Sequence, residues 1–157
     1  MKIKFICIGK TTKPFLEAGE GEYLSRLKHY VSIERIELPD IRNAKNLSRE
    51  QLKEAEGKEI LKRILPTDQL VLLDERGKEF SSVSFAAHLE QQMNQSVKTI
   101  VFVVGGAFGF SDEIYQRANM KMSLSRMTYS HQMVRMIFLE QLYRAFTIIR
   151  GEGYHHE

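Results

Sequence analysis

Short, strongly apolar segments alternate along the chain with longer segments whose apolar residues recur at helical spacing. The continuous apolar run at residues 99–104 is typical of a strand that is covered on both faces. Further strands are predicted at residues 3–8, 32–37 and 69–73, with a weaker one near 120–125. Strands that alternate with helices predict an α/β sandwich around a largely parallel sheet.

Helices are predicted between these strands from their start signals and apolar spacing. Pro14 is suited to the first turn of one helix. Ser48 and Gln51 have the spacing of a capping box and predict the start of the next. A third helix is expected at residues 83–93. The chain contains no repeat or low-complexity linker, so one continuous domain over residues 1–157 is expected.

The last predicted helix, at residues 131–150, differs from the others in its apolar pattern. At one hundred degrees per residue, its apolar side chains occupy nearly the whole circumference instead of one stripe. Such a helix has to be buried on more than one side. We expect a second copy of the chain to cover it, which predicts a homodimer through this helix. The alternative is a central helix within the monomer.

Composition excludes several classes of protein. With 157 residues, 43% of them hydrophobic and 27% charged, the chain is long enough to bury a core. No apolar run is long enough to cross a bilayer, and the first ten residues are interpreted as a strand and not as a signal peptide. The single Cys7 excludes an internal disulfide and thiolate metal sites. We therefore expect a reduced, cytoplasmic location, with no membrane and no metal.

The distribution of charge is more informative than the net charge of +3. Between residues 114 and 151 there are six basic residues and a single acid, Glu140. Guanidinium groups match phosphate oxygens, so this excess is compatible with an RNA partner. A solvated basic face explains the charge equally well. The basic residues are Arg117, Lys121, Arg126, Arg135, Arg144 and Arg150.

Two loops that contain glycine follow predicted strands. The first, Gly-Gly-Ala-Phe-Gly-Phe at residues 105–110, allows a ligand to approach the backbone closely. The second, at residues 73–78, carries Asp74 and Glu75, which can accept hydrogen bonds from a ribose or an amino group. Each loop alone is explained as a turn. Together, beyond two strand ends, they predict a cleft for a nucleoside-like ligand.

Imidazole and phenol groups supply the remaining candidate chemistry. His131 lies near the start of the last helix, where the helix dipole favours a neutral imidazole that can act as a base. Capping or packing is its alternative role. The tail ends with Tyr154 and His155, next to flexible glycines. Hydrolase signatures such as HExxH or a Gly-x-Ser-x-Gly elbow do not occur in the sequence.

Taken in order, these segments resemble the bacterial 23S rRNA large-subunit methyltransferase H family of the SPOUT superfamily. The resemblance runs essentially from end to end. It rests on Leu-Asp…Gly-Lys at 73–78, Gly-Gly-x-x-Gly at 105–109 and Leu-Ser-x-Met-Thr at 124–128. It continues with His-Gln-Met-Val-Arg at 131–135, Glu-Gln-Leu-Tyr-Arg-Ala at 140–145 and the final Tyr-His.

The resemblance implies a SPOUT fold, which is a Rossmann-like sandwich with a deep C-terminal trefoil knot, here spanning about residues 69–157. It also implies S-adenosylmethionine as the cofactor. Carried over residue by residue, the positions expected to contact this cofactor are Leu73, Gly105, Leu124, Ser125, Arg126, Met127, Thr128 and Tyr129.

The reaction implied by the resemblance is methylation at N3 of a pseudouridine, position 1915 of 23S rRNA, on the assembled ribosome. The base must lose its N3 proton, so a neutral base in the protein would help. Tyr154 and His155 are placed at the target base, in the site of the partner subunit, and His131 is a second candidate base. Arg135 is expected to contact RNA or to orient the site. The expected phosphate contacts are Arg144, Arg150, Arg126 and Lys121.

The chain departs from the family pattern at a few positions. Ser130 replaces a proline that many members have there, although serine is a good helix cap. Gly19 and Gly21 stand where better helix formers are common, which concerns stability more than activity. The alternatives are a SPOUT enzyme of the guanine-N1 tRNA type, a non-catalytic ribosome assembly factor and a dinucleotide-dependent enzyme. Enzymes of the first type carry an additional RNA-binding domain, for which this chain has no room. This chain also lacks the GxGxxG motif that a dinucleotide-dependent enzyme needs.

Overall fold

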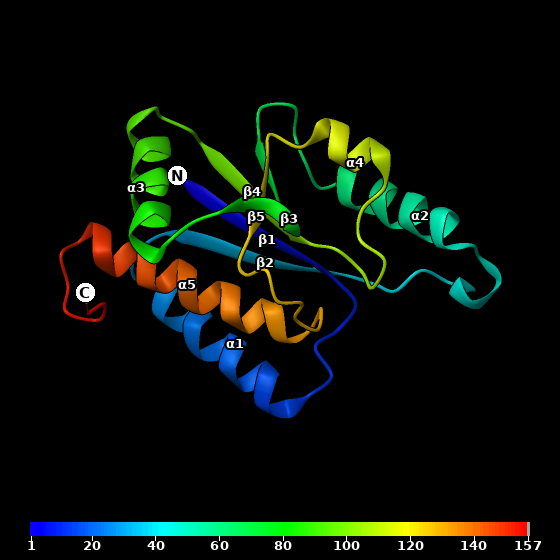
Figure 1. The fold of residues 1–157 in the computed structure, drawn as a ribbon, viewed down its shortest axis with the longest axis horizontal. Helices are drawn as coiled ribbons and strands as arrows, with labels where there is room; N and C mark the ends of the chain where they lie inside the picture. Colours follow the sequence, from blue (N-terminus) through cyan, green and yellow to red (C-terminus); the bar gives the residue numbers. More distant parts are fainter. Residues whose placement is uncertain (157) are drawn as a thin grey trace.

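Five strands form one parallel sheet in the computed structural model, which describes residues 1–156 (Figure 1). Each neighbouring pair of strands is parallel. The predicted α/β sandwich is therefore confirmed. In spatial order the strands are β2 (Ser32–Leu38), β1 (Lys2–Ile8), β4 (Thr99–Val104), β3 (Gln69–Glu79) and β5 (Met120–Ser123).

Helices cover both faces of the sheet because its strands are apolar on both sides (Figure 1). Alternate residues of β1 point to opposite faces: Phe5 lies in one core cluster and Ile6 in the other. One face carries α1 (Pro14–Leu27), α3 (Ser82–Asn94) and α5 (Met133–Ile149). The other face carries α2 (Arg49–Leu61) and α4 (Asp112–Arg117).

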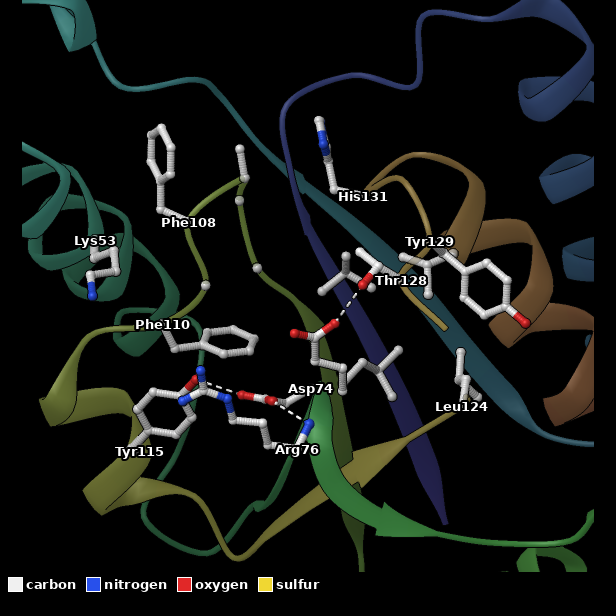
Figure 2. Close-up of a pocket in the computed structure, with 18 of the residues that line it drawn as sticks. Lys53, Asp74, Arg76, Phe108, Phe110, Tyr115, Leu124, Thr128, Tyr129 and His131 are labelled. Carbon is white, nitrogen blue, oxygen red and sulfur yellow. Dashed lines mark hydrogen bonds between the residues drawn. The ribbon is translucent and has the colours of Figure 1, made fainter. Parts of the chain in front are cut away.

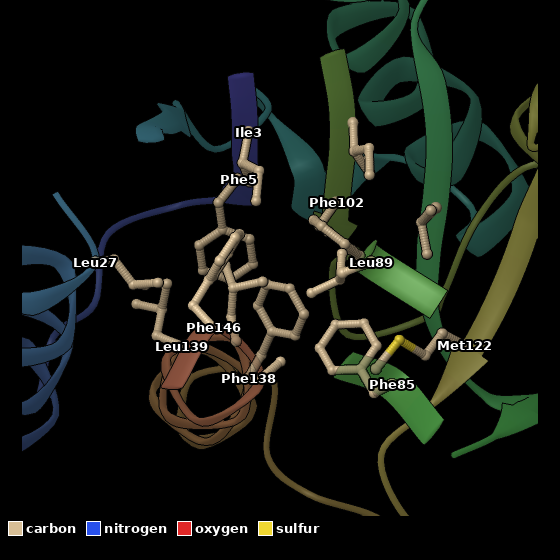
Figure 3. Packing of buried hydrophobic residues seen from close by; sticks show 14 of the residues in the cluster. Ile3, Phe5, Leu27, Phe85, Leu89, Phe102, Met122, Phe138, Leu139 and Phe146 are labelled. Atoms are coloured by element: carbon tan, nitrogen blue, oxygen red, sulfur yellow. The ribbon is translucent and has the colours of Figure 1, made fainter. Parts of the chain in front are cut away.

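The larger core is built around tilted and edge-to-face aromatic rings between α5 and the sheet (Figure 3). The ring of Phe138 on α5 lies 5.0 Å from that of Phe5 and 4.8 Å from that of Phe102, centroid to centroid. Phe85 on α3 meets Phe102 edge to face at 6.3 Å. Burying each such ring contributes roughly 1.5–3 kcal/mol. These aromatic contacts therefore hold α5 across the central strands.

Local signals explain most element boundaries. The capping box is confirmed, since the Ser48 hydroxyl accepts from the Gln51 amide at 3.1 Å and the Gln51 side chain accepts from the Ser48 amide at 2.9 Å. Pro14 begins α1 as expected. The short helix α4 was not predicted, although Ser111 caps it. The interpretation of residues 73–78 as a turn after a strand was wrong, because β3 continues to Glu79 through a bulge.

Helix α5 lies between α1 and α3, so much of its apolar circumference is covered within the chain (Figure 1). Gly19 on α1 permits this close packing, because a Cβ there would run into the side chain of Met136. On the outer side, Met133 keeps 38% of its surface exposed and Ile137 is half-buried. The dimer and the trefoil knot stay predictions. No helix within residues 1–156 has the length and apolarity to cross a membrane.

Candidate functional site

A pocket of about 700 Å³ opens beyond the carboxyl ends of β4 and β5, beside the bulge of β3 (Figure 2). Ligands of open α/β sheets bind at this edge, where loops from several strands converge. Its volume is in the usual range for a small-molecule site. The pocket gathers every residue predicted to contact the cofactor except Arg126: Leu73, Gly105, Leu124, Ser125, Met127, Thr128 and Tyr129.

The glycine loop after β4 has no room for side chains at Gly105 and Gly106. A Cβ on Gly106 would come within 2.6 Å of both carboxylate oxygens of Glu56, and one on Gly105 within 3.1 Å of the Phe110 ring. Gly109 turns the chain with a φ of 84°, which favours glycine. The loop therefore presents backbone to the pocket, as its sequence predicted.

Glu56 is a buried carboxyl behind this loop, and sequence reasoning did not identify it. Its side chain comes from α2 and the residue is only 8% exposed. Burial raises the pKa of Glu56, the charge of Asp40 raises it further, and a hydrogen bond from the Gly106 backbone opposes both. The hydrogen bond from the Gly106 backbone thus links this buried carboxyl to the glycine loop.

The acidic residues after Leu73 are already bound within the protein. Asp74 accepts hydrogen bonds from the Tyr115 hydroxyl at 2.5 Å and from the Arg76 amide at 2.8 Å (Figure 2). Burial and the bond to Asp74 raise the pKa of Tyr115 to about 12. Glu75 accepts from the Thr128 hydroxyl at 2.9 Å. These carboxylates therefore hold the pocket walls together.

Residues 124–129 form the wall opposite the glycine loop. Met127 is 77% exposed, and its amide donates to the Ser125 hydroxyl at 2.9 Å. The side chain of Arg126 points away from the pocket to Glu79, at 2.9 Å, and is 89% exposed. Its predicted cofactor contact could therefore come only from backbone atoms, whereas its exposed guanidinium is available to an RNA phosphate.

His131 lies at the pocket rim, in the turn that precedes α5. Ser130 caps that turn, since its hydroxyl accepts from the Met133 amide at 3.1 Å. Arg135, one helical turn further on, is fully buried and donates at 3.1 Å to the His131 carbonyl. The expectation that Arg135 contacts RNA needs correction, because its guanidinium has no exposed surface. Its geometry supports the alternative expectation, that it orients the site.

The remaining predicted residues are not brought to this pocket. Tyr154 donates to Glu140 at 3.0 Å in the middle of α5, and Arg144, one turn further on, contacts His155 at 3.2 Å. His131 and Val134 line the pocket at the start of that helix, whereas neither Tyr154 nor His155 lines it. Arg150 stacks on the Tyr30 ring at 4.3 Å in the same region. The tail thus packs along α5, outside the lining of the pocket of its own chain.

One further wall of the pocket was missed because it comes from α2. Arg49 and Lys53 line the pocket together with Phe108, which follows more than fifty residues later. No spacing in the sequence links these residues. Lys121 lies beside the same region, 5.4 Å from the Tyr115 ring. Within residues 1–156, no group of three or more histidine, cysteine or acidic side chains is arranged to hold a metal ion.

Comparison with known proteins identifies the family. The family described as predicted SPOUT methyltransferase matches residues 1–155. The ribosomal RNA large subunit methyltransferase H of Flavobacterium johnsoniae is 55% identical over 157 residues, covering 100% of both chains. The protein of the same name from Parabacteroides distasonis is 54% identical over the same length, again with 100% of both chains covered.

A solved structure shows the same fold at low sequence identity. A probable methylase family protein from Haemophilus influenzae superposes with a TM-score of 0.51 and 12% identity, over 99% of this chain and 70% of that one. The five-stranded parallel sheet, the pocket at its carboxyl edge and the family match over nearly the whole length agree with one another. The chain belongs to the SPOUT methyltransferase family.

Proposed function

We propose that this chain transfers a methyl group from S-adenosylmethionine to N3 of a pseudouridine in the large-subunit rRNA of the assembled ribosome. The observation that carries the proposal is the pocket itself. It unites the loop after β4, the bulge of β3 at Leu73 and residues 124–129, which are the three segments that the resemblance assigns to the cofactor. The full-length relatives named as ribosomal RNA large subunit methyltransferase H support the choice of substrate.

The residues of the pocket fit this cofactor. Apolar side chains at its base, including Leu73, Met122 and Leu124, suit a planar adenine. The backbone at Gly105 and Gly106 faces the pocket, where any side chain would collide with Phe110 or Glu56. When bound, S-adenosylmethionine supplies an electrophilic methyl group on a sulfonium. The protein's contribution is to hold the acceptor base in line with that group.

His131 is our candidate for the group that accepts the N3 proton. It is exposed, it lines the pocket, and its backbone is fixed by Arg135. A base that is hydrogen-bonded to the target can contribute about 10²- to 10⁴-fold. Exposed basic residues around the pocket, Arg126 and Lys121, are candidates for phosphate contacts, and Arg144 and Arg150 extend the basic surface along α5.

We further propose a homodimer in which the tail of one subunit completes the pocket of the other. Tyr154 and His155 are held against Glu140 and Arg144 of α5 and do not line their own pocket, which supports a role at the target base in the partner's pocket. Met133 and Ile137 on the outer side of α5 offer an apolar surface for such a partner. Because the substrate is the ribosome, the protein would act in the cytoplasm.

The proposal is tested by calorimetric titration of the purified protein with S-adenosylmethionine, with NAD as the control ligand. We expect saturable binding of the methyl donor alone. Ribosomes that lack the modification are then incubated with protein and labelled donor, and the methylated nucleotide is mapped by digestion and mass spectrometry. Binding without methylation of any ribosomal RNA would refute the proposal. A folded protein that binds ribosomes without the methyl donor would favour an assembly factor.

A further inference from the structure

Phe108 is an exposed aromatic residue at the mouth of the pocket, on the glycine loop after β4. Its side chain is 46% exposed, and the guanidinium of Arg49 lies over its ring at 4.7 Å. Figure 2 shows Phe108 and Lys53 along one side of the pocket, across from Leu124 and Tyr129. The mouth of the pocket thus has a wall that differs from the segment assigned to the cofactor.

Packing of the fold does not account for this position of Phe108. Phe110, two residues later, is 5% exposed, belongs to the smaller core and meets Tyr115 edge to face at 5.8 Å. Between the two rings, Gly109 turns the backbone with its φ of 84°. The turn therefore buries one phenylalanine and carries the other outward to the pocket, where its ring is open to a ligand.

Cations accompany the exposed ring. Arg49 and Lys53 lie one turn apart on α2, so their side chains share a face, and both line the pocket. Lys53 is paired with Glu50 at 2.7 Å, and its side chain is 20% exposed. An aromatic face with neighbouring cations is the chemistry that binds unpaired nucleotides, because the ring stacks on a base and the cations attract phosphates.

We propose that Phe108 and Arg49 form a stacking platform for an unpaired RNA base next to the target nucleotide, with Lys53 at the adjoining phosphate. This inference rests on the proposed function, since it assigns a subsite to the same RNA. The platform faces the pocket mouth, so a base stacked there would hold the strand while the neighbouring nucleotide enters the pocket. A loop nucleotide can leave its stack at low cost, which suits such a device.

The test compares Phe108→Ala, Phe108→Trp and Arg49→Ala with the wild type on unmethylated ribosomes. Loss of one base–aromatic stack should raise KM for ribosomes about fivefold to a hundredfold in Phe108→Ala. We expect kcat and the affinity for S-adenosylmethionine to stay close to wild-type values. Phe108→Trp should restore KM because indole also stacks, and Arg49→Ala should raise KM by a smaller factor.

Met93→Ala is the matched control, because Met93 is 41% exposed near the end of α3, ahead of β4 and away from the pocket. Ribosome affinity is also measured by biolayer interferometry without the methyl donor. The platform would be overturned if Phe108→Ala left both the KM for ribosomes and the affinity for ribosomes unchanged. It would also be overturned if the variant bound the methyl donor more weakly while its KM for ribosomes stayed the same. Failure of the wild type to methylate would instead refute the proposed function, while the interferometry would still decide on the platform.

Discussion

The guanidinium of Arg135 donates a hydrogen bond of 2.9 Å to the carbonyl oxygen of Gly9, 126 residues earlier in the chain. Further bonds reach the carbonyls of Ile8 at 2.6 Å and His131 at 3.1 Å, and the hydroxyl of Thr11 at 3.1 Å. Arg135 thereby ties the end of β1 to the turn that carries His131. The residue is fully buried, so its replacement should lower the stability of the protein.

Replacing Arg135 with Ala should destabilise the protein, because it leaves the buried carbonyls at residues 8 and 9 without donors. Each carbonyl left unpaired costs about 1–3 kcal/mol. Arg135→Lys should recover only part of this loss, since an ammonium lacks the fork that reaches both carbonyls. Urea unfolding measures the change. Arg150→Ala, at an exposed arginine, is the control and should change stability by less than about 1 kcal/mol. Equal losses in both would contradict the structural role of Arg135.

Removing the residues after Glu152 should abolish methylation and leave the affinity for the methyl donor nearly intact. In a dimer with shared sites, mixing this truncated chain with a full-length chain that carries His131→Ala should restore activity in one of the two pockets. The mixture tests the arrangement directly. Sedimentation must first show twice the chain mass of 18.2 kDa in dilute solution. A monodisperse monomer, or a mixture as inactive as its parts, would refute the shared site.

Two glycines should respond in opposite directions to alanine. A Cβ on Gly77, in the bulge of β3, would lie 2.5 Å from backbone atoms of Lys121 and Met122. Gly77→Ala should therefore cost about 1–3 kcal/mol through overpacking. Gly21 on α1 has nothing within 4 Å, so Gly21→Ala should stabilise the helix by about 0.5–1 kcal/mol. Midpoints of thermal unfolding compare the two, and a stabilised Gly77→Ala would show that β5 is not packed against the bulge.

Glu56 should make the stability of the protein fall as pH rises. Its folded pKa is raised above the ordinary value of 4.5, so the folded state binds the proton more tightly than the unfolded chain does. The stabilising contribution is complete below pH 4.5 and is lost as pH rises toward the folded pKa. Glu56→Gln should remove this dependence. Urea unfolding across the pH range measures it, with exposed Glu54→Gln on the same helix as control. Identical pH profiles for the wild type and Glu56→Gln would contradict the prediction.

The sequence was sufficient for features that local chemistry determines. The strand at residues 99–104 is apolar throughout because both its faces are covered, and the Ser48–Gln51 box is an interaction between near neighbours. Helix α4 was not predicted, because six residues are too few to show a periodic apolar pattern. The continuation of β3 was also missed, since it depends on pairing with β5 beyond the bulge.

Of the residues that line the pocket, only those in its loops could be predicted from the sequence. Resemblance placed Leu73, Gly105 and residues 124–129 together, and the structure brings these segments to one pocket. The burial of Arg135 had no local signal, because a buried arginine and a surface arginine have the same sequence appearance. Phe108 and Arg49 meet only through the packing of α2 beside the glycine loop. Tertiary contacts of this kind have no counterpart in local spacing.

The bonds that hold the turn before α5 join residues 132–135 to residues 8–12, early in the chain. Gln132 accepts from the Thr12 amide at 2.9 Å, and Arg135 reaches back 127 residues to Ile8. Contacts of such long sequence separation form slowly, because loop-closure entropy opposes them until late in folding. During synthesis, the turn that holds His131 cannot settle until nearly the whole chain has emerged. Affinity for the methyl donor should therefore be the last native property to appear on refolding, well after helix content has recovered.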